Sequence, residues 1–164
     1  MGINLTKFHC ESETSIKVVK DPIWDKYPDL QPLHLGSVGA PAFDLRAAEE
    51  VVVVPRQTTN ISIGVAIQMP SDMYMEIFSR SGLGSQGIIE AKGVGVIDSD
   101  YRGTLFVTLH NKTDTCFNIS IGDRIAQGIF KKKIPVCLDF VNRLDYIVDS
   151  TSRGDKGFGS TGIE

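Results

Sequence analysis

The chain of 164 residues lacks several features that would mark a membrane or a secreted protein. No stretch approaches the roughly 18 consecutive apolar residues of a membrane-spanning helix, and the first residues lack the apolar centre of a secretory signal. The three cysteines, Cys10, Cys116 and Cys137, are far apart, so neither a disulfide framework nor a paired-cysteine zinc site is expected. We therefore expect a protein of the cytoplasm or an equivalent intracellular compartment, and not a secreted one.

A surplus of positive charge is missing as well. The chain has 17 lysine and arginine residues against 20 aspartate and glutamate residues, and its formal net charge is −3. Polymeric nucleic acid is usually held by a basic face that neutralises its phosphates. The sequence therefore predicts a small-molecule partner, with no polymeric nucleic acid and no membrane bound.

Helical periodicity is scarce, and the stretch 79–87 can hold a short turn of helix at most. Alternating apolar residues instead predict strands at 59–68, 73–79 and 104–110. Three apolar, β-branched runs add further strand candidates, at 51–54, 125–130 and 134–141. Turn residues lie between these segments, which is typical of an all-β sandwich or barrel. The segment 21–41, which carries four prolines, is expected to be an irregular connection.

Glycine is present in quantity, 16 residues in all, and it punctuates the tail RGDKGFGSTG at 153–162. The stretch GFGSTG is no dinucleotide-binding fingerprint, because it lacks the preceding strand and the following helix. Its glycines let successive backbone N–H groups point into one concavity, and Ser160 and Thr161 add hydroxyl donors. Such an arrangement suits phosphate oxygens. Residues 150–164 contain few apolar side chains, so we expect a flexible C-terminal arm that becomes ordered on a ligand.

Five stretches, taken in order, resemble the trimeric deoxyuridine triphosphate nucleotidohydrolases, or dUTPases, over about residues 40 to 162. A single stretch would be modest evidence, whereas the ordered set is highly specific. The five are PAFDLRAAE at 41–49, SRSGLG at 79–84, GVIDSDYRGTLFVTLHN at 95–111, GDRIAQGIF at 122–130 and RGDKGFGSTG at 153–162.

The resemblance implies a single dUTPase-like domain over residues 1–164, an all-β, jelly-roll-like barrel or sandwich that forms a homotrimer. It also implies that each active site is built from three chains. One chain supplies Asp44, Arg80 and Gln127, a second supplies the hairpin that carries Asp98, and the third supplies the arm of residues 150–164. The arm would close over the nucleotide bound to its neighbour.

The implied reaction is hydrolysis of dUTP to dUMP and pyrophosphate, which keeps uracil out of DNA and supplies dUMP for thymidylate synthesis. Asp98 would be the catalytic residue that holds and activates the water attacking the α-phosphorus. The cofactor would be magnesium (Mg2+), chelated by phosphate oxygens and waters, with Asp44 contacting those waters rather than the ion itself.

The resemblance further implies which residues bind the substrate. The phosphate-binding set would be Arg80, Ser81, Gly82 and Gln127 for the α and β phosphates, and Arg153, Gly159, Ser160 and Thr161 for the γ phosphate. The uracil would be read by backbone groups of the hairpin from Lys92 to Asp98, including Val96 and Ile97. Tyr101 would pack under the deoxyribose, and Phe158 would stack on the base.

Two alternatives remain beside this interpretation. A dCTP deaminase-branch enzyme of the same fold would carry a glutamate on the strand after the hairpin, where this chain has Thr108. A non-catalytic, regulatory dUTPase-like protein is the second, and the presence of Asp98, Tyr101, Arg153 and Phe158 counts against it. One departure from the family pattern is Ala42, which stands where glycine is usual before the aromatic residue of the first motif.

Overall fold

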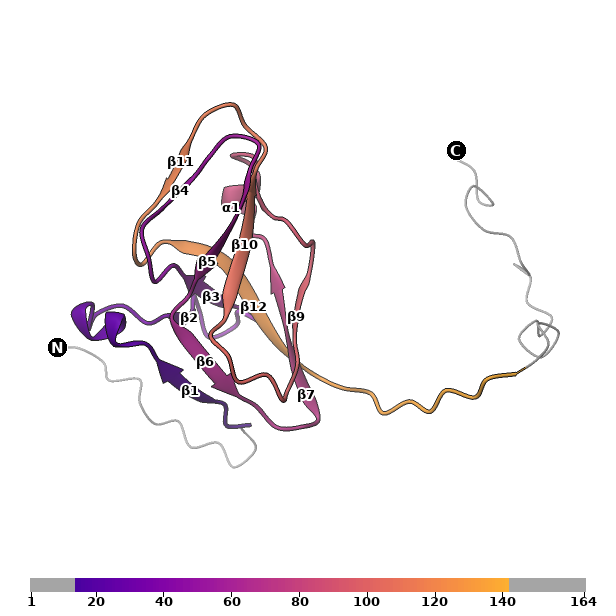
Figure 1. Ribbon diagram of the computed structural model, residues 1–164. Helices are drawn as coiled ribbons and strands as arrows, with labels where there is room; N and C mark the ends of the chain where they lie inside the picture. The colour runs from indigo at the N-terminus through magenta and orange to yellow at the C-terminus, as the bar shows by residue number, and fades with distance from the viewer. Residues whose placement is uncertain (1–13, 142–164) are drawn as a thin grey trace. The chain divides into compact units, whose positions relative to one another are not determined.

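The computed structural model describes residues 14–141 of the chain (Figure 1). The chain divides into two units, Met1–Lys133 and Ile134–Glu164, and each is described by itself. The first unit contains all of the assigned helices and strands among the described residues. A single domain over the whole chain stays a prediction, and the arm of residues 150–164 lies outside the described residues.

Almost all regular structure in the described residues is β-structure. The helical segments are a 3-10 turn, η1 (Pro22–Lys26), and one short α-helix, α1 (Ser81–Gly84). The strands are β1 (Lys17–Lys20), β2 (Leu33–Leu35), β3 (Phe43–Arg46), β4 (Val51–Val53), β5 (Thr58–Ser62), β6 (Val65–Gln68), β7 (Met73–Phe78), β8 (Ile88–Glu90), β9 (Gly95–Ile97), β10 (Phe106–Asn111), β11 (Phe117–Ile119) and β12 (Arg124–Lys132).

The strands form antiparallel sheets in which neighbours are mostly far apart in sequence. The largest sheet has the order β2-β3-β12-β7-β9, and a second has the order β5-β10-β8. Two further pairs, β1 with β6 and β11 with β4, complete the set. In Figure 1 the long strand β12 runs between β3 and β7, so it joins the early and middle parts of the chain. This central position matters because β12 carries Gln127.

The apolar residues that alternate in the sequence are the residues whose side chains are buried in the core. Ile61, Ile63, Val65 and Ile67 are all buried, and so are the inward-facing residues of β7 and β10. The core cluster also contains Leu45, Ala47, Val53, Met69, Met73, Met75, Ile77, Ile88, Leu105, Val107, Leu109, Ile119, Ile125 and Ala126. Because one face of each main strand points into this cluster, the other face of the large sheet is left for polar side chains.

The segment 59–68, predicted as one strand, is two strands separated by a bend at Gly64. Gly64 has φ of +60°, a left-handed conformation that favours glycine. The indole Nε1 of buried Trp24 donates to the carbonyl oxygens of Ile63 and Gly64, both at 3.2 Å. A Cβ at Gly64 would lie 2.7 Å from that nitrogen, so the close approach of the tryptophan also requires glycine.

The segment 134–141 was expected to add a strand, and this prediction is wrong. The strand β12 ends at Lys132, and no strand is assigned over 134–141. A strand needs a hydrogen-bonded neighbour, and no described strand pairs with this segment. Pro135 also lacks a backbone N–H. The expectation of little helix is confirmed, and no helix among the described residues has the length and apolar character to cross a membrane.

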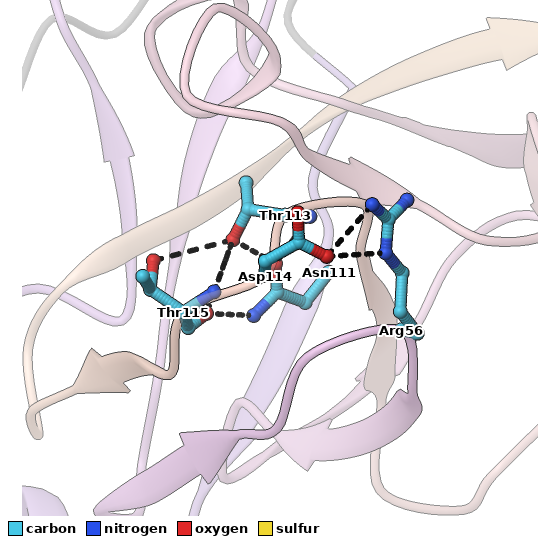
Figure 2. Close-up of polar contacts among 5 residues, drawn as sticks. All are labelled: Arg56, Asn111, Thr113, Asp114 and Thr115. Atoms are coloured by element: carbon cyan, nitrogen blue, oxygen red, sulfur yellow. Dashed lines mark hydrogen bonds and ion pairs between the residues drawn. The ribbon is translucent and has the colours of Figure 1, made fainter.

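A buried amide anchors the loop that follows β10 (Figure 2). Nδ2 of Asn111 donates to the carbonyl oxygens of Val53 and Thr115, at 2.9 and 2.8 Å. Its Oδ1 accepts from the backbone N and the hydroxyl of Thr113, at 2.9 and 2.8 Å. At the surface of the same loop, Arg56 forms an ion pair with Asp114 at 2.8 Å. The asparagine thus pairs with backbone groups of β4 and of the loop, and it shares the carbonyl oxygen of Thr115 with the hydroxyl of Thr113.

Candidate active site

Side chains predicted to act on phosphate come from neighbouring strands of the large sheet. Asp44 of β3 lies directly opposite Gln127 of β12, which lies opposite Phe78 at the end of β7. Directly opposed residues point to the same face of a sheet, here the face away from the core. Nε2 of Gln127 donates to the carbonyl oxygen of Ser79 at 3.2 Å. This bond ties β12 to the segment that carries Arg80.

Asp44 holds two arginines. Its Oδ1 accepts from Nε of Arg80 at 2.9 Å, and its Oδ2 accepts from Nη1 of Arg124 at 3.2 Å. Only 13% of the Asp44 side chain is exposed, so solvent screens these pairs less than pairs on the open surface. Nη1 of Arg80 also donates to the carbonyl oxygen of Arg124 at 3.3 Å. We call these three residues the arginine cluster.

Arg124 is a site residue that reasoning from the sequence missed. It stands three positions before Gln127, and in a regular strand residues three apart point to opposite faces. The pairing of β12 with β3 has an irregularity here, because Arg124 opposes Arg46 while Ala126 opposes Leu45. Ile125 is the extra residue. The apolar doublet Ile125–Ala126 between two polar residues is the available signal for this bulge in the sequence.

Ser81 and Gly82 follow Arg80 directly as the first residues of α1, and both are exposed. A Cβ built at Gly82 would meet nothing within 4 Å, so the backbone there is open to the approach of a ligand. The structure therefore places Ser81 and Gly82 next to the arginine cluster, because they directly follow Arg80 in the chain.

The remaining described site residues lie between β8 and β9, on β9 and just after it. The expected hairpin is not formed by these two strands, because β8 pairs with β10 and β9 pairs with β7. The backbone N of Lys92 donates to Oε2 of buried Glu90 at 2.6 Å, which fixes the turn that follows β8. On β9, Ile97 packs against the core, whereas Val96 is exposed. Asp98 follows the strand, and it is exposed.

Tyr101 folds back over the loop that follows Asp98. Its backbone N donates to the carbonyl oxygen of Asp98 at 3.2 Å, and its hydroxyl donates to that of Thr104 at 2.9 Å. A Cβ at Gly103 would overlap ring atoms of Tyr101, so the absence of a side chain lets the ring lie against the backbone. The ring stays partly exposed, as a surface for packing needs.

The arginine cluster and the residues around Asp98 lie at opposite ends of β7. Ile97 opposes Met75 and Gly95 opposes Ile77, so Asp98 lies beside the start of β7. Arg80 follows the end of the same strand. Six residues of extended chain separate the two places, a distance of about 20 Å at roughly 3.3 Å per residue. One chain therefore does not bring Asp98 to the arginine cluster.

An ion pair occupies the sheet face between these two ends. The carboxylate of Glu76 on β7 contacts the ammonium of Lys131 on β12. The hydrogen bond from Lys131 holds the pKa of Glu76 below its usual value, and the same bond raises the pKa of Lys131. The ammonium also lies 5.9 Å from the ring centroid of Phe78. This pair links β7 to β12 near the site without belonging to either group.

Comparison with known proteins identifies the family. The family model described as dUTPase matches residues 29–162. The deoxyuridine 5'-triphosphate nucleotidohydrolase of Vaccinia virus (strain Copenhagen) is 38% identical over 156 residues, which cover 95% of this chain and 99% of that protein. The chain belongs to the dUTPase family. The resemblance that the five motifs suggested is thereby confirmed.

Solved structures of dUTPases agree with the fold. The Staphylococcus bacteriophage 80alpha dUTPase with dUPNHPP matches with a TM-score of 0.77 at 22% identity, over 91% of this chain and 99% of that one. A mutant dUTPase from phage phi11 of S. aureus, described with the coordination of a structural Mg(II) ion, matches with a TM-score of 0.69 at 19% identity, over 79% and 97%. The predicted all-β, jelly-roll-like fold is confirmed.

The described residues of this dUTPase-family chain fit a magnesium ion whose ligands are mainly substrate phosphates and waters. Within residues 14–141, no three histidine, cysteine, aspartate or glutamate side chains lie close enough to hold a metal. Mg2+ often keeps several waters and binds through substrate phosphates. Both oxygens of Asp44 accept from guanidinium groups, and each retains a further lone pair for a metal-bound water.

Two parts of the sequence interpretation remain, the arm of the dUTPase resemblance and the deaminase alternative. The arm residues, Arg153, Phe158, Gly159, Ser160 and Thr161, lie outside the described residues. Thr108, by contrast, is buried on β10, and its hydroxyl donates to Oδ1 of Asn60 at 2.7 Å. A hydroxyl engaged in this way offers no general base where the deaminase branch carries a glutamate.

Proposed function

We propose that the protein hydrolyses dUTP to dUMP and pyrophosphate, which keeps uracil out of DNA and supplies dUMP for thymidylate synthesis. The observation that carries the proposal is that Asp44 and Gln127 lie opposite each other on neighbouring strands, with Arg80 bound to Asp44, in a chain of the dUTPase family. Guanidinium and amide donors on one face suit a polyphosphate.

Asp98 is proposed to hold and activate the attacking water. As the water oxygen bonds to the α-phosphorus, its proton passes to the Asp98 carboxylate, and the bond from that phosphorus to the bridging oxygen breaks. The electron pair leaves with pyrophosphate. In support, Asp98 is exposed and its carboxylate has no hydrogen-bond partner among the described residues, so it is free to bind water.

Phosphate binding is divided between the sheet and the arm in this proposal. Arg80, Ser81, Gly82 and Gln127 hold the α and β phosphates. Asp44 would hold a magnesium ion through its bound waters, and that ion would supply charge neutralisation on the triphosphate. The γ phosphate is held by the arm, through Arg153, Gly159, Ser160 and Thr161, with Arg153 acting as an arginine finger.

The segment from Lys92 to Tyr101 is proposed to select the base and the sugar. Backbone groups between Lys92 and Asp98, including those of Val96 and Ile97, present donors and acceptors that match uracil and not cytosine. Tyr101 packs under the deoxyribose and leaves no space for a ribose 2'-hydroxyl. Phe158 of the arm stacks on the uracil.

The active protein is proposed to be a homotrimer. The distance between Arg80 and Asp98 along β7 supports this, because a single α-phosphorus must contact both groups. A second chain that places its Asp98 beside the arginine cluster removes the difficulty, and the arm of a third chain covers the nucleotide.

The direct test is pyrophosphate release from dUTP, dCTP, UTP and dTTP with magnesium present, with ammonia release from dCTP measured in parallel. We expect turnover of dUTP to exceed that of the others by at least about a hundredfold, because unpaired polar groups in a hydrogen-bonding site penalise the wrong base. Mass measurement in solution should give three chains. Deamination of dCTP, or no release of pyrophosphate from dUTP, would overturn the proposal.

A further inference from the structure

A serine next to Asp98 is buried although both of its neighbours are exposed. Ser99 exposes 9% of its surface, whereas Asp98 and Asp100 are open to solvent. Buried hydroxyls are normally hydrogen-bonded, and this one has two partners. It accepts from Nζ of Lys133 at 2.9 Å, and it donates to the carbonyl oxygen of Ser71 over a longer distance of 3.4 Å. Ser99 therefore fastens the loop that carries Asp98 to two other segments of the chain.

The three segments meet because β12, β7 and β9 are neighbouring strands of the large sheet. The last residue of β12 opposes the first residue of β7, and β9 ends near the start of β7 on its other side. The residues that follow β12 and β9 therefore share one end of the sheet. There the backbone N of Lys133 donates to the carbonyl oxygen of Asp72 at 2.7 Å. This bond places the long lysine side chain beside the turn before β7, within reach of Ser99.

The backbone of the loop around Ser99 is held as well. Nη1 of Arg102 donates to the carbonyl oxygen of Ser99 at 2.7 Å and to that of Tyr101 at 2.9 Å. The backbone N of Tyr101 donates to the carbonyl oxygen of Asp98 at 3.2 Å. Asp98 is thus followed by fixed backbone, while its own side chain is exposed. The direction of the Asp98 carboxylate then depends on how firmly Ser99 is held.

Lys133 is the last of three successive lysines, and the three differ in what they contact. The ammonium of Lys131 pairs with Glu76. Lys132 is exposed, and its side chain forms no ion pair within residues 14–141. Lys133 binds the hydroxyl of Ser99 instead of a carboxylate. The run therefore contains one lysine that acts on the Asp98 loop and, directly before it, a lysine that does not.

We propose that Lys133 and Ser99 are positioning residues for Asp98. The ammonium of Lys133 holds the hydroxyl of Ser99, Ser99 fixes the backbone next to Asp98, and the Asp98 carboxylate is thereby directed at the attacking water. Neither residue contacts the substrate in this proposal. Misplacing a reacting group by about 1 Å can cost about a hundredfold in rate, so contacts outside the site can control turnover. The inference rests on the proposed function for the role of Asp98.

The first test compares the steady-state kinetics of variants at two adjacent lysines. Lys133→Met keeps the length of the side chain and removes the donor. We expect kcat for dUTP to fall about tenfold and KM to change less than about twofold, because the groups that bind the nucleotide are untouched. Lys133→Arg keeps a charged donor and should retain kcat within about threefold. The matched control, Lys132→Met, should change neither parameter.

The second test separates positioning from general damage to the fold. A positioning residue acts through Asp98, so its effect should vanish once the Asp98 carboxylate is gone. In the Asp98→Asn background, Lys133→Met should therefore leave the residual turnover unchanged, because residues that act as a unit are not additive. Ser99→Ala should reproduce the loss seen in Lys133→Met, and the two changes together should lose no more than either alone. A full further loss in the Asp98→Asn background would overturn the inference.

Failure of this inference is distinct from failure of the proposed function. Pyrophosphate release from dUTP by the unaltered protein, and its loss in Asp98→Asn, test the function. If both are observed while Lys133→Met or Ser99→Ala keeps normal kcat, the positioning role is wrong and the function stands. Thermal unfolding shows whether each variant is folded. Should Lys133→Met unfold, Ser99→Ala decides the question, because it removes a single hydroxyl oxygen.

Discussion

The two halves of the candidate site differ in how completely one chain builds them. The phosphate half is fastened by hydrogen bonds and ion pairs among Asp44, Arg80, Arg124 and Gln127, which come from distant parts of the sequence. The nucleoside half, from Lys92 to Tyr101, is one local stretch of chain, the strand β9 with its flanking loops, whose Val96, Asp98 and Tyr101 are exposed. The first half is organised before a ligand arrives. The second presents its groups outward, as a surface that another chain must meet.

The largest effect on turnover is expected in the nucleoside half. Asp98→Asn keeps the size of the side chain and removes the base, so kcat for dUTP should fall about 10²- to 10⁴-fold. Stability should change little, because the carboxylate is exposed. The matched control is Asp100→Asn, two residues on and also exposed, which should keep near-normal turnover. Equal losses in the two variants, read from steady-state kinetics, would show that position 98 is not special.

A second variant separates stability from catalysis. Asn111→Ala removes the buried amide of Figure 2, which donates to the carbonyl oxygens of Val53 and Thr115 and accepts from Thr113. The free energy of unfolding should fall by about 1–3 kcal/mol, measured by denaturant titration. The exposed pair offers the control, since Asp114→Asn should cost under about 1 kcal/mol. Kinetics of the folded Asn111→Ala protein should match those of the unaltered one, and a lowered kcat in a fully folded sample would contradict this division.

A third variant tests the proposed role of Tyr101, in the nucleoside half, as the residue that packs under the deoxyribose. In Gly103→Ala the new methyl group overlaps the Tyr101 ring, which must move. We expect kcat/KM for dUTP to fall about tenfold, which corresponds to about 1.4 kcal/mol of transition-state binding. Gly39→Ala is the control, because a Cβ there meets nothing within 4 Å. Unchanged kinetics in Gly103→Ala would remove Tyr101 from the site.

The smallest effect concerns the ion pair between the halves. The pKa of Glu76 is lowered by the hydrogen bond from Lys131, so the pair stabilises the folded state at neutral pH. That contribution is lost as pH falls through the lowered pKa. Glu76→Gln should therefore lower Tm slightly at pH 7 and have the same Tm as the unaltered protein in acid. A difference in Tm that persists in acid would point to lost packing instead of lost charge.

The sequence predicted the core strands well, because alternation is a local signal. Ile61 to Ile67 and the inward residues of β7 and β10 are buried as expected. Two features escaped the alternation. The Gly64 bend depends on Trp24, which lies 40 residues away in sequence. The segment 134–141 has the composition of a strand but no described strand to pair with, and composition does not encode pairing.

The candidate site was predictable where family motifs name residues and hidden where geometry decides. The motifs named Asp44, Arg80 and Gln127, and the structure brings these three together. Arg124 stands in the same motif as Gln127, yet strand periodicity assigns it to the opposite face. Only the register of β12 against β3 reveals the bulge, and register is set by contacts between segments about 80 residues apart.

Mixed trimers test the division of the site between chains most directly. Arg80→Ala and Asp98→Asn should each be nearly inactive alone, since each lacks one half. Mixed in equal amounts and reassembled, they should regain roughly a quarter of the unaltered activity, because each site draws Arg80 and Asp98 from different chains at random. Mixtures that stay as inactive as the separate variants, while the unaltered protein hydrolyses dUTP as a single chain, would contradict the account.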